Sequence, residues 1–135
     1  MTIQTIREGI AKNLATIPGL RTSAFVPDNP TPPIAVVIPN RVEFDASYQR
    51  GMDQFTFDVI VIAARASERN AQRTLDGYCN STGSTSIKAA IETDKTLGGT
   101  VMDCRVTELT GYGPLAIGEV QYLSATFTVA AIGNS

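Results

Sequence analysis

Residues 54–63 read QFTFDVIVIA, and this stretch decides the fold because it is the strongest strand signal in the chain. Successive side chains of a strand point to opposite faces. One face is apolar throughout, with Phe55, Phe57, Val59 and Val61. The other begins polar and ends apolar, with Thr56, Asp58, Ile60 and Ile62. The pattern predicts a central strand that is covered on one face along its length and on both faces at its C-terminal end.

The segments before this strand predict one helix and further strands. Residues 2–17 place Ile3, Ile6, Ile10, Leu14 and Ile17 on one helical face, and Pro18-Gly19 end the helix. A short strand is expected at 23–26. Four prolines at 27–33 then predict a stiff connector, because proline lacks an amide donor and cannot sit in a central strand. Residues 34–38 are apolar up to Pro39, 41–45 alternate, and 47–53 read as a loop.

The segments after the central strand predict two helices and two more strands. A helix begins at Ser67-Glu68, turn residues follow at 80–85, and a short helix covers 87–91. Strands are expected at 101–109 and 119–132, joined by GYGPLAIG at 111–118. This order favours an α+β fold: a mainly antiparallel β-sheet of about four to five strands, with an N-terminal helix and a central helix pair packed on one face.

Composition restricts the class of protein. A chain of 135 residues suits one domain, 1–135, and 43% hydrophobic with 18% charged residues is typical of a globular protein. No apolar run approaches the roughly 18 residues that a membrane span needs. The charged amphipathic N-terminus does not read as a signal peptide. A net charge of −2 argues against binding nucleic acid through its phosphates.

Catalytic signals are weak. The chain has no histidine, which removes His-activated nucleophiles and His metal ligands. The two cysteines, Cys79 and Cys104, are expected to be reduced and partly buried. The acid pairs Asp45 with Asp53, and Asp103 with Glu108, are expected to be solvated surface acids. We therefore expect no enzyme, no cofactor and no metal.

Basic residues and glycines give no stronger signal of a binding site. Arg65, Arg69 and Arg73 are spaced to line one helix face, which could bind a polyanion but is more typical of a solvated helix face. Neither Gly98-Gly99 nor Gly111-x-Gly113 follows a strand and opens a helix, so neither is expected to bind phosphate.

Four segments in order carry a resemblance: VPDNPTPPIAVVIPN at 26–40, DQFTFDVIVIAARASERNAQRTLDGY at 53–78, SIKAAIETDKTLGGTVMDCRVT at 86–107 and GYGPLAIGEVQYLSATFTVAAI at 111–132. Together they resemble the tail terminator proteins of long, non-contractile-tailed bacteriophages that infect actinobacteria. The resemblance spans nearly the whole chain and lies in the order and spacing of structural patterns, because none of the segments is a catalytic signature.

The resemblance implies an α+β protein of the virion, in the neck region of the phage tail, assembled in the host cytoplasm. It implies a homo-oligomer, a hexameric ring on the head-proximal end of the tail tube. Such a ring stops polymerisation of the tail tube protein and gives the head connector, or head-closure protein, a surface to dock on. DNA would pass through the lumen without sequence-specific binding, and no enzyme activity, cofactor or membrane is implied.

A ring subunit needs two unlike side faces, so rigid or apolar segments outside the expected core are candidates for its interfaces. Three segments qualify: the proline connector, the 49–53 loop and the GYGPLAIG connection. Their candidate interface residues are Pro27, Pro30, Pro32, Pro33, Arg50, Met52, Tyr112, Pro114, Leu115 and Ile117. Tyr112, Leu115 and Ile117 are expected to contact protein, either their own domain or a neighbouring subunit.

Two other functions remain open. Another neck component of the same particle, a tail completion or head-closure protein, would also be a small α+β assembly protein. A small-ligand-binding or enzymatic α+β domain would need a concave pocket with convergent polar groups.

Overall fold

The computed structural model describes residues 3–23, 31–44, 52–97, 99, 101 and 103–134, without the side chains of Met52 and Asn134. The expected order of helices and strands is confirmed. The elements are α1 (Ile3–Leu14), β1 (Arg21–Ser23), β2 (Ile34–Glu43), β3 (Met52–Arg65), α2 (Ala71–Cys79), α3 (Ile87–Ile91), the 3₁₀ turn η1 (Glu92–Asp94), β4 (Asp103–Ile117) and β5 (Val120–Asn134).

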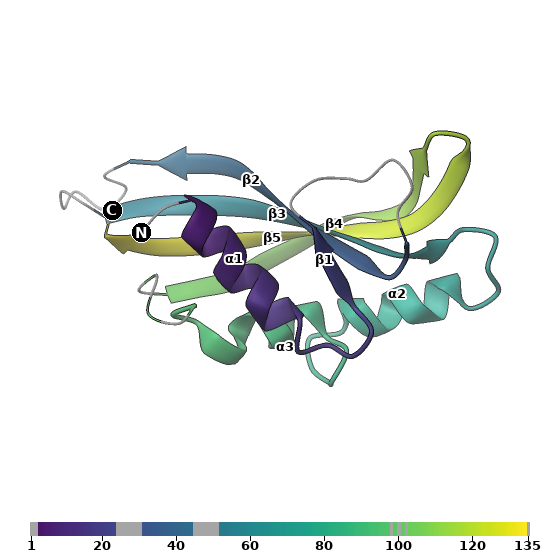
Figure 1. The fold of residues 1–135 in the computed structure, drawn as a ribbon, viewed down its shortest axis with the longest axis horizontal. Coiled ribbons are helices and arrows are strands. Elements are labelled where there is room, and N and C mark those ends of the chain that lie inside the picture. The colour runs from purple at the N-terminus through teal and green to yellow at the C-terminus, as the bar shows by residue number, and fades with distance from the viewer. Residues whose placement is uncertain are drawn as a thin grey trace.

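The strands form a five-stranded sheet in the order β1-β2-β3-β5-β4 (Figure 1). β1 runs parallel to β2, and every other neighbouring pair is antiparallel. The predicted α+β class with a mainly antiparallel sheet is therefore confirmed. β3 lies at the centre of the sheet, as the apolar stretch at 54–63 requires.

The helices cover one face of the sheet (Figure 1). The main core joins the odd-numbered side chains of β3, such as Phe57 and Val59, to residues of all three helices. The helix residues in this core are Ile6, Ile10 and Leu14 of α1, Leu75 and Tyr78 of α2, and Ile87, Ala90 and Ile91 of α3. The helical spacing thus identified Ile6, Ile10 and Leu14 correctly, but Ile3, expected on the same face, is 37% exposed at the start of α1.

A second, smaller apolar cluster lies at the C-terminal end of β3. Ile62 packs there with Ile34 of β2 and Tyr122 of β5. Ile62 is fully buried, and so is Val61 beside it on the opposite face. The prediction that this end of the strand is covered on both faces is confirmed.

A side-chain amide joins the N-terminal helix to the central helices. Asn13 donates from Nδ2 to the carbonyl oxygens of Ile91, at 3.0 Å, and Asp94, at 3.1 Å. Carbonyl groups at the end of a helix lack partners within the helix, so this amide satisfies two of them. These two bonds therefore hold α1 against the end of α3 and the 3₁₀ turn that follows it.

β2 is longer than its sequence suggests, because Pro39 does not end it. The register of β2 against β3 shifts between Pro39 and Arg41, which leaves Asn40 as the extra residue of a bulge. A bulge at an outer strand accommodates a proline, which cannot donate to a ladder. β1 pairs only with residues 34–36, so the backbone at Pro39 lies beyond β1.

The prediction that Arg65, Arg69 and Arg73 share a helix face is wrong. β3 continues to Arg65, which pairs with Tyr122, and α2 begins only at Ala71. Arg69 therefore lies in the turn between the two elements. The sequence pattern suggested that the helix begins at Ser67-Glu68. Strand pairing at Arg65 takes precedence over local helix propensity, so the chain first turns away from the sheet and the helix begins later.

The prediction that GYGPLAIG connects two strands is also wrong. The stretch from Gly111 to Ile117 belongs to β4, which pairs with β5 up to Ile117 and Val120. The connection is only Gly118-Glu119. Gly118 has φ of 62°, the positive angle that a two-residue hairpin turn needs at its first position.

Candidate assembly surface

The β4–β5 hairpin bends at Gly111. Thr110 pairs with Thr126 and Gly113 pairs with Ser124, so Gly111 and Tyr112 together oppose a single residue, Ala125. Gly111 has φ of 65°, the left-handed conformation of a glycine that opens a β-bulge. The distal part of the hairpin therefore curves out of the plane of the sheet, at the upper right of Figure 1.

A hydrogen bond holds this bend against α2. The Tyr112 hydroxyl donates to Oδ1 of Asp76 at 2.6 Å, while its side chain remains 41% exposed. The bond to the Asp76 carboxylate raises the pKa of Tyr112, so the phenol stays protonated at neutral pH. The bulge and the Tyr112–Asp76 bond together give the hairpin a defined orientation.

The apolar residues of the hairpin contact their own domain. Leu115 and Ile117 are half-buried and pack against the small cluster of Ile34, Ile62 and Tyr122. Pro114 is exposed. The expectation that Leu115 and Ile117 contact protein is confirmed in its intramolecular form, and a contact with another subunit stays a prediction.

The structure brings two of the predicted interface segments together. Pro32 and Pro33 are half-buried, and the carbonyl of Pro33 accepts from the Arg21 amide at 3.2 Å. The next residue, Ile34, belongs to the same cluster as Leu115. The end of the proline connector therefore lies beside the hairpin, while Pro27 and Pro30 lie outside the described residues.

The third candidate segment is at the opposite end of the sheet. Met52 begins β3 and pairs with Asn134, whereas the hairpin cluster lies at the other end of the same strand. Arg50 lies outside the described residues. Asp53 is part of β3 and only 3% exposed, so the expectation that Asp53 is a solvated loop acid is wrong, and its expected partner Asp45 is not among the described residues.

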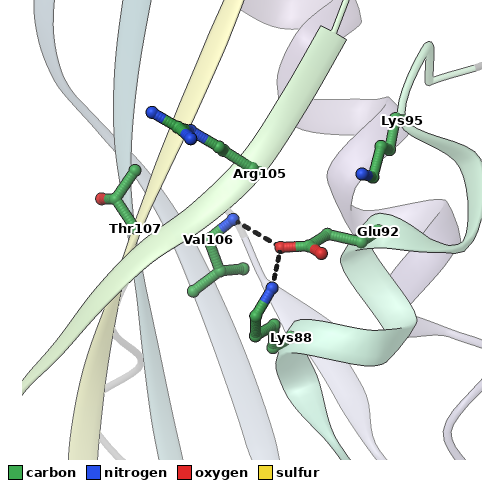
Figure 2. Close-up of a pocket in the computed structure, with 6 residues that line it drawn as sticks. All are labelled: Lys88, Glu92, Lys95, Arg105, Val106 and Thr107. Carbon is green, nitrogen blue, oxygen red and sulfur yellow. Dashed lines mark hydrogen bonds and ion pairs between the residues drawn. The ribbon is translucent and has the colours of Figure 1, made fainter. Parts of the chain in front are cut away.

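A cleft of about 370 Å³ lies between the α3–η1 segment and β4 (Figure 2). Glu92 accepts there from Lys88 Nζ at 2.5 Å and from the backbone amide of Val106 at 3.1 Å. Arg105 points away from this group, as Figure 2 shows. In this cleft Glu92 thus connects Lys88 of α3 to a backbone amide of the outer strand β4.

The charges around Glu92 favour its ionised form. Burial alone would raise the pKa of Glu92, but the hydrogen bonds from Lys88 and Val106, with the charges of Lys88 and Lys95, lower it overall. The half-buried carboxylate is thus charged at neutral pH and accepts from two donors, and hydrogen bonds to the charged form favour it.

The thiols are not activated. Burial, followed by the nearby charge of Asp76, raises the pKa of Cys79 to about 11. Burial and nearby acids, Asp103 first, raise the pKa of Cys104 to about 11. A thiolate is the reactive form of cysteine, so these raised pKa values leave little of that form at neutral pH.

Asp103 and Glu108 are exposed, as expected. Within the described residues no group of three or more Cys, Asp or Glu side chains could hold a metal ion, and no helix there is long and apolar enough to span a membrane. A scan against known protein families finds no match, and no curated protein matches the chain.

Two surface residues were not found from the sequence. Asp76 reads as an ordinary acid on α2, and only the fold places it beside Tyr112. Phe44 is 75% exposed, although its alternation with Val42 suggested an ordinary strand residue. The sequence signal that could have identified Phe44 as a surface residue is its position, because it is the last large apolar residue before the polar cluster that begins at Ser47.

Proposed function

We propose that this chain is a structural assembly protein, a tail terminator that forms a hexameric ring on the head-proximal end of a phage tail tube. The observation that carries the proposal is the shaped β4–β5 hairpin. Its bend is set by Gly111 and its orientation by the Tyr112–Asp76 bond. A hairpin that contacts no partner would need neither the bend nor the bond.

The hairpin gives the subunit a rigid projection beyond its main core. Leu115 and Ile117 hold its distal part on the Ile34 cluster, and parts of both side chains remain accessible. Pre-ordered segments lose little conformational entropy when they bind, so such a projection suits an interface. In the proposed ring it would contact a neighbouring subunit or the tail tube protein.

The rest of the molecule is compatible with this role. The net charge of −2 would leave a ring lumen without the strongly basic surface that would retain passing DNA. The resemblance of the four sequence segments to tail terminators supports the same function. The head connector, or a head-closure protein, would dock on the opposite side of the ring from the tube.

Deleting the gene from the phage that encodes it tests the proposal. We expect overlong or unjoined tails, because the tube would lack both its stop and its docking surface, and electron microscopy measures both defects. A plasmid copy of the wild-type gene should restore tail length and head joining. Tails of normal length that are joined to heads would overturn the proposal.

The same particles separate the terminator from another neck protein. Localising the chain in the wild-type virion by a fused tag should place it directly on the last ring of tube subunits. A position between the connector and the head, with no contact to the tube, would favour a head-closure or tail completion protein instead.

A further inference from the structure

Phe44 is an apolar side chain without a place in the core. It follows directly after β2, and its 75% exposure is the largest among the exposed large hydrophobic residues described. Val42, two residues earlier, packs against the main core. One exposed phenylalanine would not by itself indicate a partner, because single apolar residues are common on protein surfaces.

A hollow of matching size lies on the helix-covered side of β4. We call it the β4 notch; it has a volume of about 170 Å³. Leu109, Val106 and Phe127 supply its apolar lining, and Cys79 borders it from the end of α2. Leu109 is 36% exposed there. A cavity of about 150 Å³ can hold a benzene molecule, so the notch is large enough for a phenyl ring.

Phe44 cannot fill the β4 notch of its own chain. β3 and β5 separate β2 from β4 in the sheet. Three steps between strands of about 4.8 Å each span roughly 14 Å, which is further than a phenylalanine side chain reaches. The apolar side chain and the hollow therefore lie on opposite sides of the subunit, and they can meet only between two copies.

The charges around the two features are compatible with such a contact. Arg41 and Glu43 precede Phe44 and form an exposed ion pair with each other. Lys88 and Glu108 line the β4 notch. The described residues on each side thus carry groups of both signs, with Lys88 also paired with Glu92, so docking does not bring two like-charged patches together.

We propose that Phe44 of one copy inserts into the β4 notch of the next copy. The contact is head-to-tail, because it leaves the notch of the first copy and Phe44 of the second free for further subunits. Repeating it generates a ring if the rotation closes. The inference rests on the proposed function, since it names a contact by which the ring subunits would join.

Sedimentation of the purified full-length chain over a concentration series tests the contact. We expect the wild type to associate beyond a dimer, and Phe44→Ala and Leu109→Glu each to weaken association at least tenfold. Ser81→Arg, at the exposed border of the notch, provides a second blocked variant if Leu109→Glu disturbs folding. Ile3→Ala removes a different exposed apolar side chain and should leave association unchanged.

Mixing the variants tests the direction of the contact. Phe44→Ala keeps an intact notch, and Leu109→Glu keeps an intact Phe44. A head-to-tail contact therefore predicts that the mixture forms dimers and nothing larger, since each pair contains one functional contact. A wild type that stops at dimers would overturn the head-to-tail arrangement.

Two results would overturn the contact itself. One is association of Phe44→Ala as tight as that of the wild type, with both chains folded by circular dichroism. The other is a wild type that stays monomeric up to about 1 mM, the range of the weakest useful contacts. Neither result would change the expected deletion phenotype. A normal deletion phenotype would overturn the tail terminator function but would leave this contact intact.

Discussion

At the scale of single residues, Gly9 of α1 lies close to Leu97 in the turn before β4. Leu97 is buried and holds a positive φ of 51°, which non-glycine residues adopt rarely. A Cβ atom added at Gly9 would lie 2.8 Å from the Cβ of Leu97. Gly9 thus lets α1 pack directly on the turn that leads into β4.

Gly9→Ala should therefore destabilise the protein. Alanine in a helix interior normally stabilises by about 0.5–1 kcal/mol over glycine, but overpacking of a core contact costs about 1–3 kcal/mol. We expect a lower free energy of unfolding in urea. Gly77→Ala in α2 is the matched control, because its Cβ would meet only the Thr85 hydroxyl, at 3.2 Å. Equal stabilisation by both substitutions would contradict this account.

At the scale of elements, Glu92 joins the α3–η1 segment to the outer strand β4. Its carboxylate accepts from Lys88 and from the Val106 amide, and these contacts lower its pKa in the folded protein. A carboxyl group with a lowered pKa contributes stability above its unfolded pKa and loses that contribution as the pH falls through its folded pKa.

The stability of the wild type should therefore fall on acidification below about pH 4.5, the ordinary range for a glutamate. In Glu92→Gln the side chain cannot titrate, so part of this fall should disappear while the neutral-pH stability drops. Melting temperatures measured between pH 3 and pH 7 would show the difference. Glu68→Gln, at an exposed turn residue, is the control and should follow the wild type.

Elements with a regular apolar period were predictable from the sequence, whereas the bend within β4 was not. Alternation at 54–63 and the helical spacing of Ile6, Ile10 and Leu14 reflect burial directly, so these elements were predicted correctly. The glycines of GYGPLAIG suggested a turn, yet Gly111 forms a bulge inside β4. A bulge and a turn need the same residue type, and only the register against β5 separates them.

The candidate surface was predictable to a similar degree. The apolar residues Leu115 and Ile117 were expected to contact protein, and both pack against their own domain. The partners of the hairpin, Asp76 on α2 and Ile34 on β2, are distant in sequence. Such pairs follow from how the strands are ordered in the sheet, which a local pattern does not contain.

At the scale of the whole molecule, the hairpin must be separable from folding if it serves assembly. Leu115 and Ile117 pack against the small cluster on the sheet face opposite the helices, while the main core lies on the other face. Full burial of one such side chain contributes about 1.5–3 kcal/mol, and partial burial less. A domain of ordinary stability, about 5–15 kcal/mol, tolerates that loss.

The double substitution of Leu115 and Ile117 by Ser should therefore leave the domain folded and weaken its association with tail tubes. Circular dichroism measures the first property, and co-sedimentation with purified tubes measures the second. Leu75→Ser, in the fully buried core, is the contrasting variant and should unfold the protein. If the double variant unfolds in the same way, the hairpin belongs to the core and its interface role is wrong.

The two edges of the sheet are poorly suited to pairing with further strands. β1 is only three residues long, Pro39 and its bulge follow on β2, and β4 carries two bulges, Pro114 and the Val106 amide already bound by Glu92. Irregular, charged or proline-bearing borders prevent sheets from adding strands without limit. These borders therefore disfavour edge-to-edge pairing between copies of this chain, which suits a subunit whose proposed task is to end a polymer.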